Sequence, residues 1–290
     1  MASETSSKDV YIDASGVTIH YYRWSPRGEP RAIVQLAHGL GEHAQRYGEL
    51  VQFLTQSGIE VWADDHRGHG ATGLEQWGGD HSKLGKLGPG GMPATLRAVR
   101  DFTQVIREAR PDQPLFFLGH SWGSIMGQMI LNRGGANHYD GMILTGTAYR
   151  WPGFMNAGDL NARHKHLGKI GAEWLSRDVA VHEAWRDDPL TFVANTMKLF
   201  GPVDAARLIG KPKKLDTDIP LLIMIGSDDS LGGEKSVTKL AEAYVAAGAR
   251  DVEVQIYDQA RHEVFNETNR AEVRADLLMW LEGRLQGANA

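Results

Sequence analysis

The feature that most constrains the fold is a serine placed between two glycines at the predicted junction of a strand and a helix. The stretch reads Gly119-His120-Ser121-Trp122-Gly123. An apolar run at 115–118 precedes it, and apolar side chains at helical spacing follow it. In this context a G-x-S-x-G turn strains the backbone and lifts the serine hydroxyl above the edge of a sheet. The pattern therefore predicts that Ser121 is a nucleophile.

Strand-length apolar runs alternate with amphipathic, helix-length stretches through most of the chain. Two short runs at 10–12 and 17–24 predict an entry hairpin. Further strands are predicted at 32–37, 59–63, 115–118, 141–145, 219–225 and 252–257. Strands that alternate with helices indicate an α/β fold with a mostly parallel, doubly wound sheet. Ligands of such sheets bind beyond the carboxyl ends of the strands.

Two stretches interrupt this alternation. Residues 64–91 hold nine glycines in 28 positions and are predicted to form one long functional loop. Residues 148–215 contain tryptophans and prolines but no strand-length apolar run. We expect a helical lid at 148–215 that covers the carboxyl edge of the sheet, inserted into a catalytic body formed by 1–147 and 216–290.

A serine hydroxyl needs a neighbouring base, and the base needs an acid that orients it. Asp228 and Asp229 follow one predicted strand, and His262 follows the next. The G-x-x-D pattern favours Asp229 as the acid, with Asp228 as the alternative. Glu263 is a third candidate, although its position beside His262 is unfavourable. The order serine, acid, histidine is the one that accompanies a G-x-S-x-G turn.

An oxyanion that forms during acyl transfer needs two N–H donors. One is the backbone N–H of Trp122, directly after the serine. The second is expected from the loop that follows the strand at 32–37, which reads His38-Gly39-Leu40-Gly41. By position we assign it to the backbone N–H of Leu40.

Other histidines gather in the loops that would surround this site: His38, His43, His66, His69 and His81. They lack the compact spacing of a zinc motif, so hydrogen bonds that fix the loops are the favoured interpretation. The aromatic side chains at 148–215 and at Trp122 leave two interpretations open. They either pack the lid onto the body or form an apolar pocket for an acyl chain.

Composition excludes several classes of function. The formal charge of −5, without a basic block, argues against a nucleic-acid partner. The chain has no cysteine, which excludes a thiolate metal site and a cysteine nucleophile. Residues 1–9 are polar and no stretch has the length of a transmembrane helix, so we expect a cytoplasmic enzyme. Composition does not indicate the oligomeric state.

Several motifs together resemble the monoacylglycerol lipase and lysophospholipase-like branch of the α/β-hydrolases, also called serine aminopeptidase-like hydrolases. The motifs begin at His38, Asp65, Gly119, Gly226 and His262, and they span about residues 31–267. The resemblance implies an α/β-hydrolase fold, with Ser121 as nucleophile, Asp229 as acid and His262 as base. It also implies that Leu40 and Trp122 supply the oxyanion donors. The family's turn commonly reads Gly-His-Ser-Met-Gly-Gly, whereas Trp122 and Ser124 stand here for the methionine and the last glycine.

The sequence thus predicts a serine hydrolase that cleaves carboxylic esters through an acyl-enzyme, without a metal or organic cofactor. The substrate is expected to be a small-molecule ester, either monoacylglycerol- or lysophospholipid-like or another small apolar ester. Transient contact of the lid with a membrane surface is left open. Alternatives within the fold are a thioesterase, an amide or peptide hydrolase, a lactonase, a hydrolase of xenobiotic esters and a perhydrolase. A relative that binds a small apolar ligand without catalysis is the alternative from another class.

Overall fold

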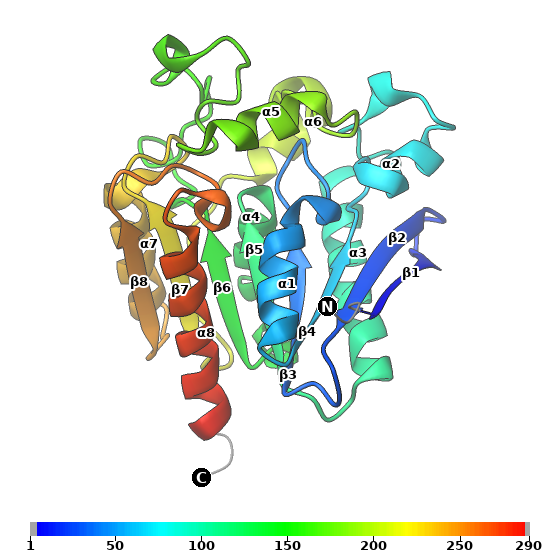
Figure 1. Ribbon diagram of the computed structural model, residues 1–290, viewed down its shortest axis with the longest axis vertical. Helices are drawn as coiled ribbons and strands as arrows, with labels where there is room; N and C mark the ends of the chain where they lie inside the picture. Colours follow the sequence, from blue (N-terminus) through cyan, green and yellow to red (C-terminus); the bar gives the residue numbers. More distant parts are fainter. Residues whose placement is uncertain (1–4, 288–290) are drawn as a thin grey trace.

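The computed structural model describes residues 5–287 and is built around one eight-stranded sheet (Figure 1). The strand order is β1-β2-β4-β3-β5-β6-β7-β8. The strands from β3 to β8 pair in parallel, whereas β1 and β2 are antiparallel additions at one edge. The bounds are β1 (Thr5–Ile12), β2 (Thr18–Ser25), β3 (Ala32–Ala37), β4 (Ile59–Asp64), β5 (Leu115–His120), β6 (Gly141–Thr145), β7 (Leu221–Gly226) and β8 (Val252–Tyr257).

Helices cover both faces of this sheet, which confirms the predicted doubly wound α/β-hydrolase fold. On one face α1 (Gly48–Gln56) and α8 (Arg270–Gly287) pack against the strands. The opposite face carries α3 (Gly91–Ala109), α4 (Trp122–Leu131) and α7 (Gly233–Ala246). Figure 1 shows these two layers with the sheet between them. The five central strands are buried along their whole length because their residues are almost all apolar.

The stretch 64–91 is not one long loop, and this expectation is wrong. It contains α2 (Gly70–Gln76) and a short 3-10 helix at His81–Lys83. Three of the first four residues of α2 are glycine or threonine, which have low helix propensity. The sequence therefore did not indicate a helix here. Tertiary packing supports it instead, since the carboxylate of Asp65 accepts from the backbone N–H of Ala71 at 2.8 Å.

Residues 148–215 connect β6 to β7 and lie across the carboxyl ends of the strands (Figure 1). The segment holds a 3-10 helix at Lys165–Leu167, α5 (Val179–Asp187) and α6 (Thr196–Arg207). Helix α6 is kinked at Gly201, where φ is 71°. Long irregular stretches join these helices, so the segment is less helical than expected. Its role as a lid stays a prediction at this stage.

Two predicted features concern the ends of the chain and its relation to membranes. Residues 1–4 of the polar N-terminal stretch lie outside the described residues, as do residues 288–290 of the predicted body. Across 5–287, no helix combines the length and apolar character required to cross a membrane.

Candidate active site

Ser121 lies between the end of β5 and the start of α4, on a strained turn. Its backbone has φ 52° and ψ −116°, a conformation that residues with a side chain rarely adopt. The turn is held because the Ser121 N–H donates to the Thr145 carbonyl at 2.9 Å. A Cβ at Gly119 would lie 2.7 Å from the backbone of Gly123, so this glycine is required by the close approach of strand and helix. The predicted strand-turn-helix context of the serine is confirmed by these bounds.

Gly123 gives a test of how tightly this turn is packed. A Cβ at this position would run into the carbonyl group of Ala37 on β3. We expect Gly123→Ala to lower the free energy of unfolding by about 3 kcal/mol, because backbone atoms cannot move aside as a flexible side chain can. Urea denaturation measures the change. Gly283→Ala is the matched control, since nothing lies within 4 Å of its Cβ position, and it should be neutral or slightly stabilising.

The loop after β3 lies directly against the serine. A Cβ on Gly39 would be 3.1 Å from the Ser121 Cβ. The Gly39 N–H donates to Glu42 Oε1 at 2.6 Å, so it is not free to bind an oxyanion. Within the described residues, no acceptor is bonded to the backbone N–H of Leu40 or of Trp122. The N–H of Trp122 is also the first of helix α4, where the helix dipole favours negative charge.

The structure brings Asp229 and His262 together. Asp229 Oδ2 is 2.9 Å from His262 Nδ1, and both side chains are buried. The other oxygen of Asp229 accepts from the Leu231 N–H at 2.7 Å, which fixes the carboxylate. The alternatives lie elsewhere, since Asp228 pairs with Arg163, and Glu263 pairs with Arg46. Among the three acids weighed from the sequence, Asp229 is the one in contact with the imidazole.

The His262 ring lies between two aromatic rings, with Trp174 at 4.4 Å and His120 at 4.7 Å between centroids. Its Nε2 makes no hydrogen bond with any residue of the described range. Ser121 Oγ therefore does not contact this nitrogen here, although His120, its neighbour, does lie against the ring. Nucleophile–base hydrogen bonds are commonly long without substrate and shorten when it binds.

Burial and the carboxylate act in opposite directions on His262. Burial works to lower the pKa of the ring, but the negative charge of Asp229 outweighs it, so the pKa of His262 is raised. The ring can accept a proton only when it is neutral. We therefore expect kcat/KM to fall about tenfold per pH unit as the pH drops, with the midpoint above about 6.5. A pH–rate profile with a soluble ester measures it; a midpoint below 6 would contradict the electrostatics described here.

The other loop histidines make hydrogen bonds, as the sequence suggested, either to backbone carbonyls or to carboxylates. His38 Nδ1 is 2.7 Å from the Gly39 carbonyl, and His69 Nδ1 is 3.0 Å from that of Arg67. Burial lowers the pKa of His38, and it lowers that of His69 to about 3, so both rings are neutral. The remaining contacts are His66 to Asp64, His43 to Asp188 and His81 to the Pro189 carbonyl. Over residues 5–287 no group of three or more His, Asp or Glu side chains is arranged to hold a metal ion.

The 148–215 segment contacts each loop of the site. The N–H of Glu263 donates to the Leu175 carbonyl at 2.7 Å, which joins the segment to the histidine loop. The N–H of Phe192 donates to the Gly41 carbonyl at 3.1 Å, beside the loop after β3. Phe200 lies 5.5 Å from the Trp122 ring. The segment therefore contacts the histidine loop, the loop after β3 and the start of α4.

Sequence reasoning missed two features of this site. Trp174 was noted only as one of several tryptophans, and no local signal places it against His262, because the contact joins residues 88 positions apart. The second feature is a buried ion chain through Glu42, Arg46 and Glu263. The spacing of Glu42 and Arg46, four positions apart, was a readable signal for a pair.

The parallel sheet, the strained serine turn and the acid–histidine pair at neighbouring strand ends define an α/β-hydrolase. The family model of the serine aminopeptidase S33 hydrolases matches residues 28–269, so the chain belongs to that family. A monoacylglycerol lipase of Mycolicibacterium smegmatis is 32% identical and covers 98% of this chain and 100% of its own length. Human monoglyceride lipase is 26% identical, over 94% of this chain and 89% of its own.

Solved structures agree with this assignment. A thermostable carboxyl esterase from Bacillus coagulans superposes with a TM-score of 0.77 at 25% identity, covering 98% of this chain and 100% of its own. A soluble variant of the monoglyceride lipase from Saccharomyces cerevisiae has the same fold, with a TM-score of 0.76 at 21% identity over 98% and 96% of the two chains. The resemblance to the monoacylglycerol lipase-like branch is thereby confirmed.

Proposed function

We propose that this chain hydrolyses carboxylic esters through an acyl-enzyme. Ser121 attacks the ester carbonyl, and His262 takes its proton and then passes it to the leaving alcohol. Asp229 orients the imidazole and stabilises its charged form, and the N–H groups of Leu40 and Trp122 bind the oxyanion. In the second half of the reaction, water attacks the acyl-enzyme while His262 takes a proton from it. His262 then gives that proton to the Ser121 oxygen, and the carboxylic acid leaves.

The observation that carries the proposal is the hydrogen bond between Asp229 and His262 beyond the ends of β7 and β8. A buried carboxylate at 2.9 Å fixes the imidazole with Nδ1 as donor, which leaves Nε2 free to act as a base. The strained backbone of Ser121 supports the same role, because such conformations are kept mainly where function requires them.

The proposed substrates are esters of a small polar alcohol with an apolar acyl chain, such as monoacylglycerols. This follows the relatives, which include monoacylglycerol lipases, and the esterase from Bacillus coagulans, whose structure contains glycerol. Aromatic side chains beside the serine suit an apolar acyl group, as Trp122 packs against Phe200 and lies 5.2 Å from His69.

The 148–215 segment is proposed to act as a lid that controls access to Ser121. Support comes from its contacts with the histidine loop, with Gly41 and with Trp122. Several of its large apolar side chains are exposed, among them Val193, Met197 and Val203. An apolar outer surface of this kind suits a segment that meets lipid-like substrates.

The proposal is tested by a burst assay with p-nitrophenyl esters from acetate to palmitate. A fluorophosphonate label, read by mass spectrometry of the digested protein, reports the nucleophile in parallel. We expect a burst of one p-nitrophenol per chain and a label on Ser121. Neither burst nor label with any ester would exclude the mechanism and favour a protein that binds an apolar ligand without catalysis.

Trp122 is expected to shorten the acyl site. Trp122→Met removes the buried indole and opens space beside the serine, so kcat/KM for long-chain relative to short-chain esters should rise about tenfold or more. The same ester series measures the ratio. Trp280→Met is the matched control, because Trp280 is equally buried but packs against Phe116 on the sheet. An unchanged ratio for Trp122→Met would place the acyl chain away from this ring.

A further inference from the structure

A chain of buried charges joins the two loops that flank the serine. Glu42 Oε2 accepts from Arg46 Nη1 at 2.7 Å. Arg46 then binds both oxygens of Glu263, with Nη1 at 2.8 Å and Nη2 at 3.1 Å. The three side chains are between 5% and 9% exposed. We call Glu42, Arg46 and Glu263 the ion clamp.

Each end of the ion clamp holds a residue that is next in the chain to a candidate catalytic group. At one end, Glu42 Oε1 accepts from the Gly39 N–H at 2.6 Å, one residue before Leu40. At the other end, Glu263 follows His262 directly in the chain. Its carboxylate is also bonded to Asn266, and its backbone N–H to Leu175. The clamp therefore spans from the proposed oxyanion loop to the proposed base.

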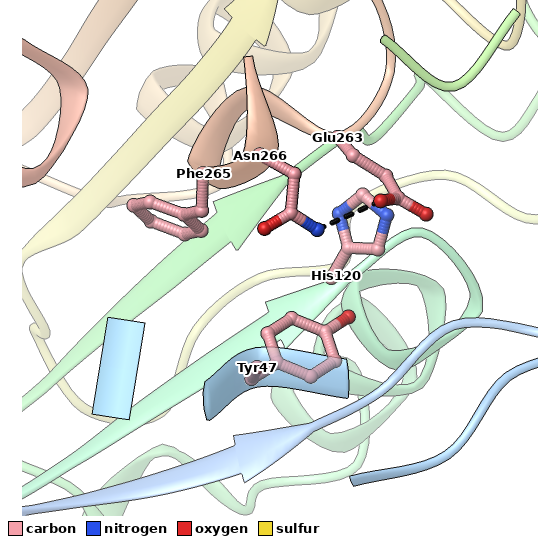
Figure 2. A pocket seen from close by; sticks show the side chains of 5 residues that line it. All are labelled: Tyr47, His120, Glu263, Phe265 and Asn266. Carbon is pink, nitrogen blue, oxygen red and sulfur yellow. Dashed lines mark hydrogen bonds between the residues drawn. The ribbon is translucent and has the colours of Figure 1, made fainter. Parts of the chain in front are cut away.

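Glu263 of the clamp borders a small cavity beside His120, whose ring contacts that of His262. Figure 2 shows Glu263 and Asn266 beside the ring of His120, with Tyr47 on the other side. The cavity has a volume of about 10 Å³, near the minimum for one water molecule. Glu263 is the member of the clamp that lines this cavity, so its contacts with Arg46 hold the histidine loop on the side where the space lies.

We propose that Glu42, Arg46 and Glu263 are positioning residues that set the distance between the Leu40 N–H and His262. The inference rests on the proposed ester hydrolysis. Glu42 also accepts the hydrogen bond of the Gly39 N–H, which leaves Leu40 as the donor of this loop. A bidentate pair of a guanidinium with a carboxylate fixes orientation as well as distance, which a lysine could not do.

The electrostatics keep the pair of Arg46 and Glu263 charged. Burial works to raise the pKa of Glu263, but Arg46 outweighs it and lowers that pKa to about 2. Burial also opposes the charge of Arg46, yet its two carboxylate partners raise the pKa of the guanidinium above its ordinary value. Glu263 and Arg46 therefore stay ionised wherever the enzyme is active. This pair of the clamp holds the two loops in place and does not respond to pH in the range where the enzyme works.

Four variants test the inference. Glu42→Leu removes both the ion pair and the acceptor for Gly39, whereas Glu42→Gln keeps an oxygen acceptor of the same shape. Arg46→Lys keeps the charge but loses the bidentate contact with Glu263. The matched control is Glu60→Gln, because Glu60 is a buried carboxylate paired with Arg23 and Arg110 at the opposite end of β4.

We expect kcat with a soluble p-nitrophenyl ester to fall about 100-fold in Glu42→Leu, with KM unchanged, because the reacting groups lose their alignment. Glu42→Gln keeps an acceptor for Gly39 but loses the ion pair with Arg46, so this variant and Arg46→Lys should both lie between Glu42→Leu and the wild type. Glu60→Gln should keep the wild-type kcat. The melting temperature is measured for every variant, so that a loss of stability is separated from a loss of alignment.

The inference is overturned if Glu42→Leu or Arg46→Lys keeps the kcat of Glu60→Gln. Either result would mean that the clamp only stabilises the fold. The proposed function fails separately, when the wild-type chain neither hydrolyses esters nor takes the fluorophosphonate label at Ser121.

Discussion

Replacing Ser121 with alanine is expected to lower kcat for p-nitrophenyl esters by about 10⁴-fold or more. The variant loses the oxygen that is proposed to form the acyl-enzyme, whereas the proposed oxyanion donors, the N–H groups of Leu40 and Trp122, are kept. KM should therefore change little. The fluorophosphonate label at residue 121 should disappear, which is checked by mass spectrometry of the same digest.

Stability gives the control for this prediction. Ser121 has φ 52°, so its conformation costs about 1–3 kcal/mol in any residue with a side chain and almost nothing in glycine. We expect Ser121→Ala to melt near the wild-type temperature and Ser121→Gly to melt higher, although both are inactive. Hydrolysis at the wild-type rate by either variant would refute the assignment of the nucleophile.

The sequence was sufficient for most of the sheet because the signal for a buried parallel strand is local. Ala32–Ala37 is apolar at five of its six positions, Val252–Tyr257 alternates apolar with polar residues, and the strands begin and end there. The serine turn was equally local, since two glycines and a serine must be close in sequence to make it. Order along the chain then placed the acid and histidine loops at neighbouring strand ends.

Contacts between segments that are far apart in the chain could not be predicted from the sequence. Helix α2 is stabilised by Asp65 and by its packing, not by its own propensity. The contact of Trp174 with His262 depends on the path of the 148–215 segment, which has no regular period to follow. The Arg67 guanidinium lies 3.5 Å from the carboxylate of Asp13, which is far away in the chain on the entry hairpin. Such pairings follow from the fold and cannot precede it.

The choice between Asp228 and Asp229 shows where local reasoning ends. Both follow β7, and a shift of one residue in the strand end would exchange their directions. In the structure Asp229 is 2% exposed and bonded to His262, whereas Asp228 lies at the surface beside Arg163 and His164. The two neighbours therefore form a matched pair for mutation.

We expect Asp229→Asn to lower kcat by about 10⁴-fold with little change in KM. An asparagine amide donates where the carboxylate accepted, so it favours the wrong tautomer of His262 and cannot stabilise the imidazolium. The pKa of His262, followed by NMR titration of its ring protons, should also fall, because burial then acts without the opposing charge of Asp229. Asp228→Asn should keep kcat within about twofold of the wild type, since it loses only a partly exposed ion pair. If the two variants exchanged these effects, Asp228 would be the acid, and the loop after β7 would have to turn its other carboxylate toward His262 during turnover.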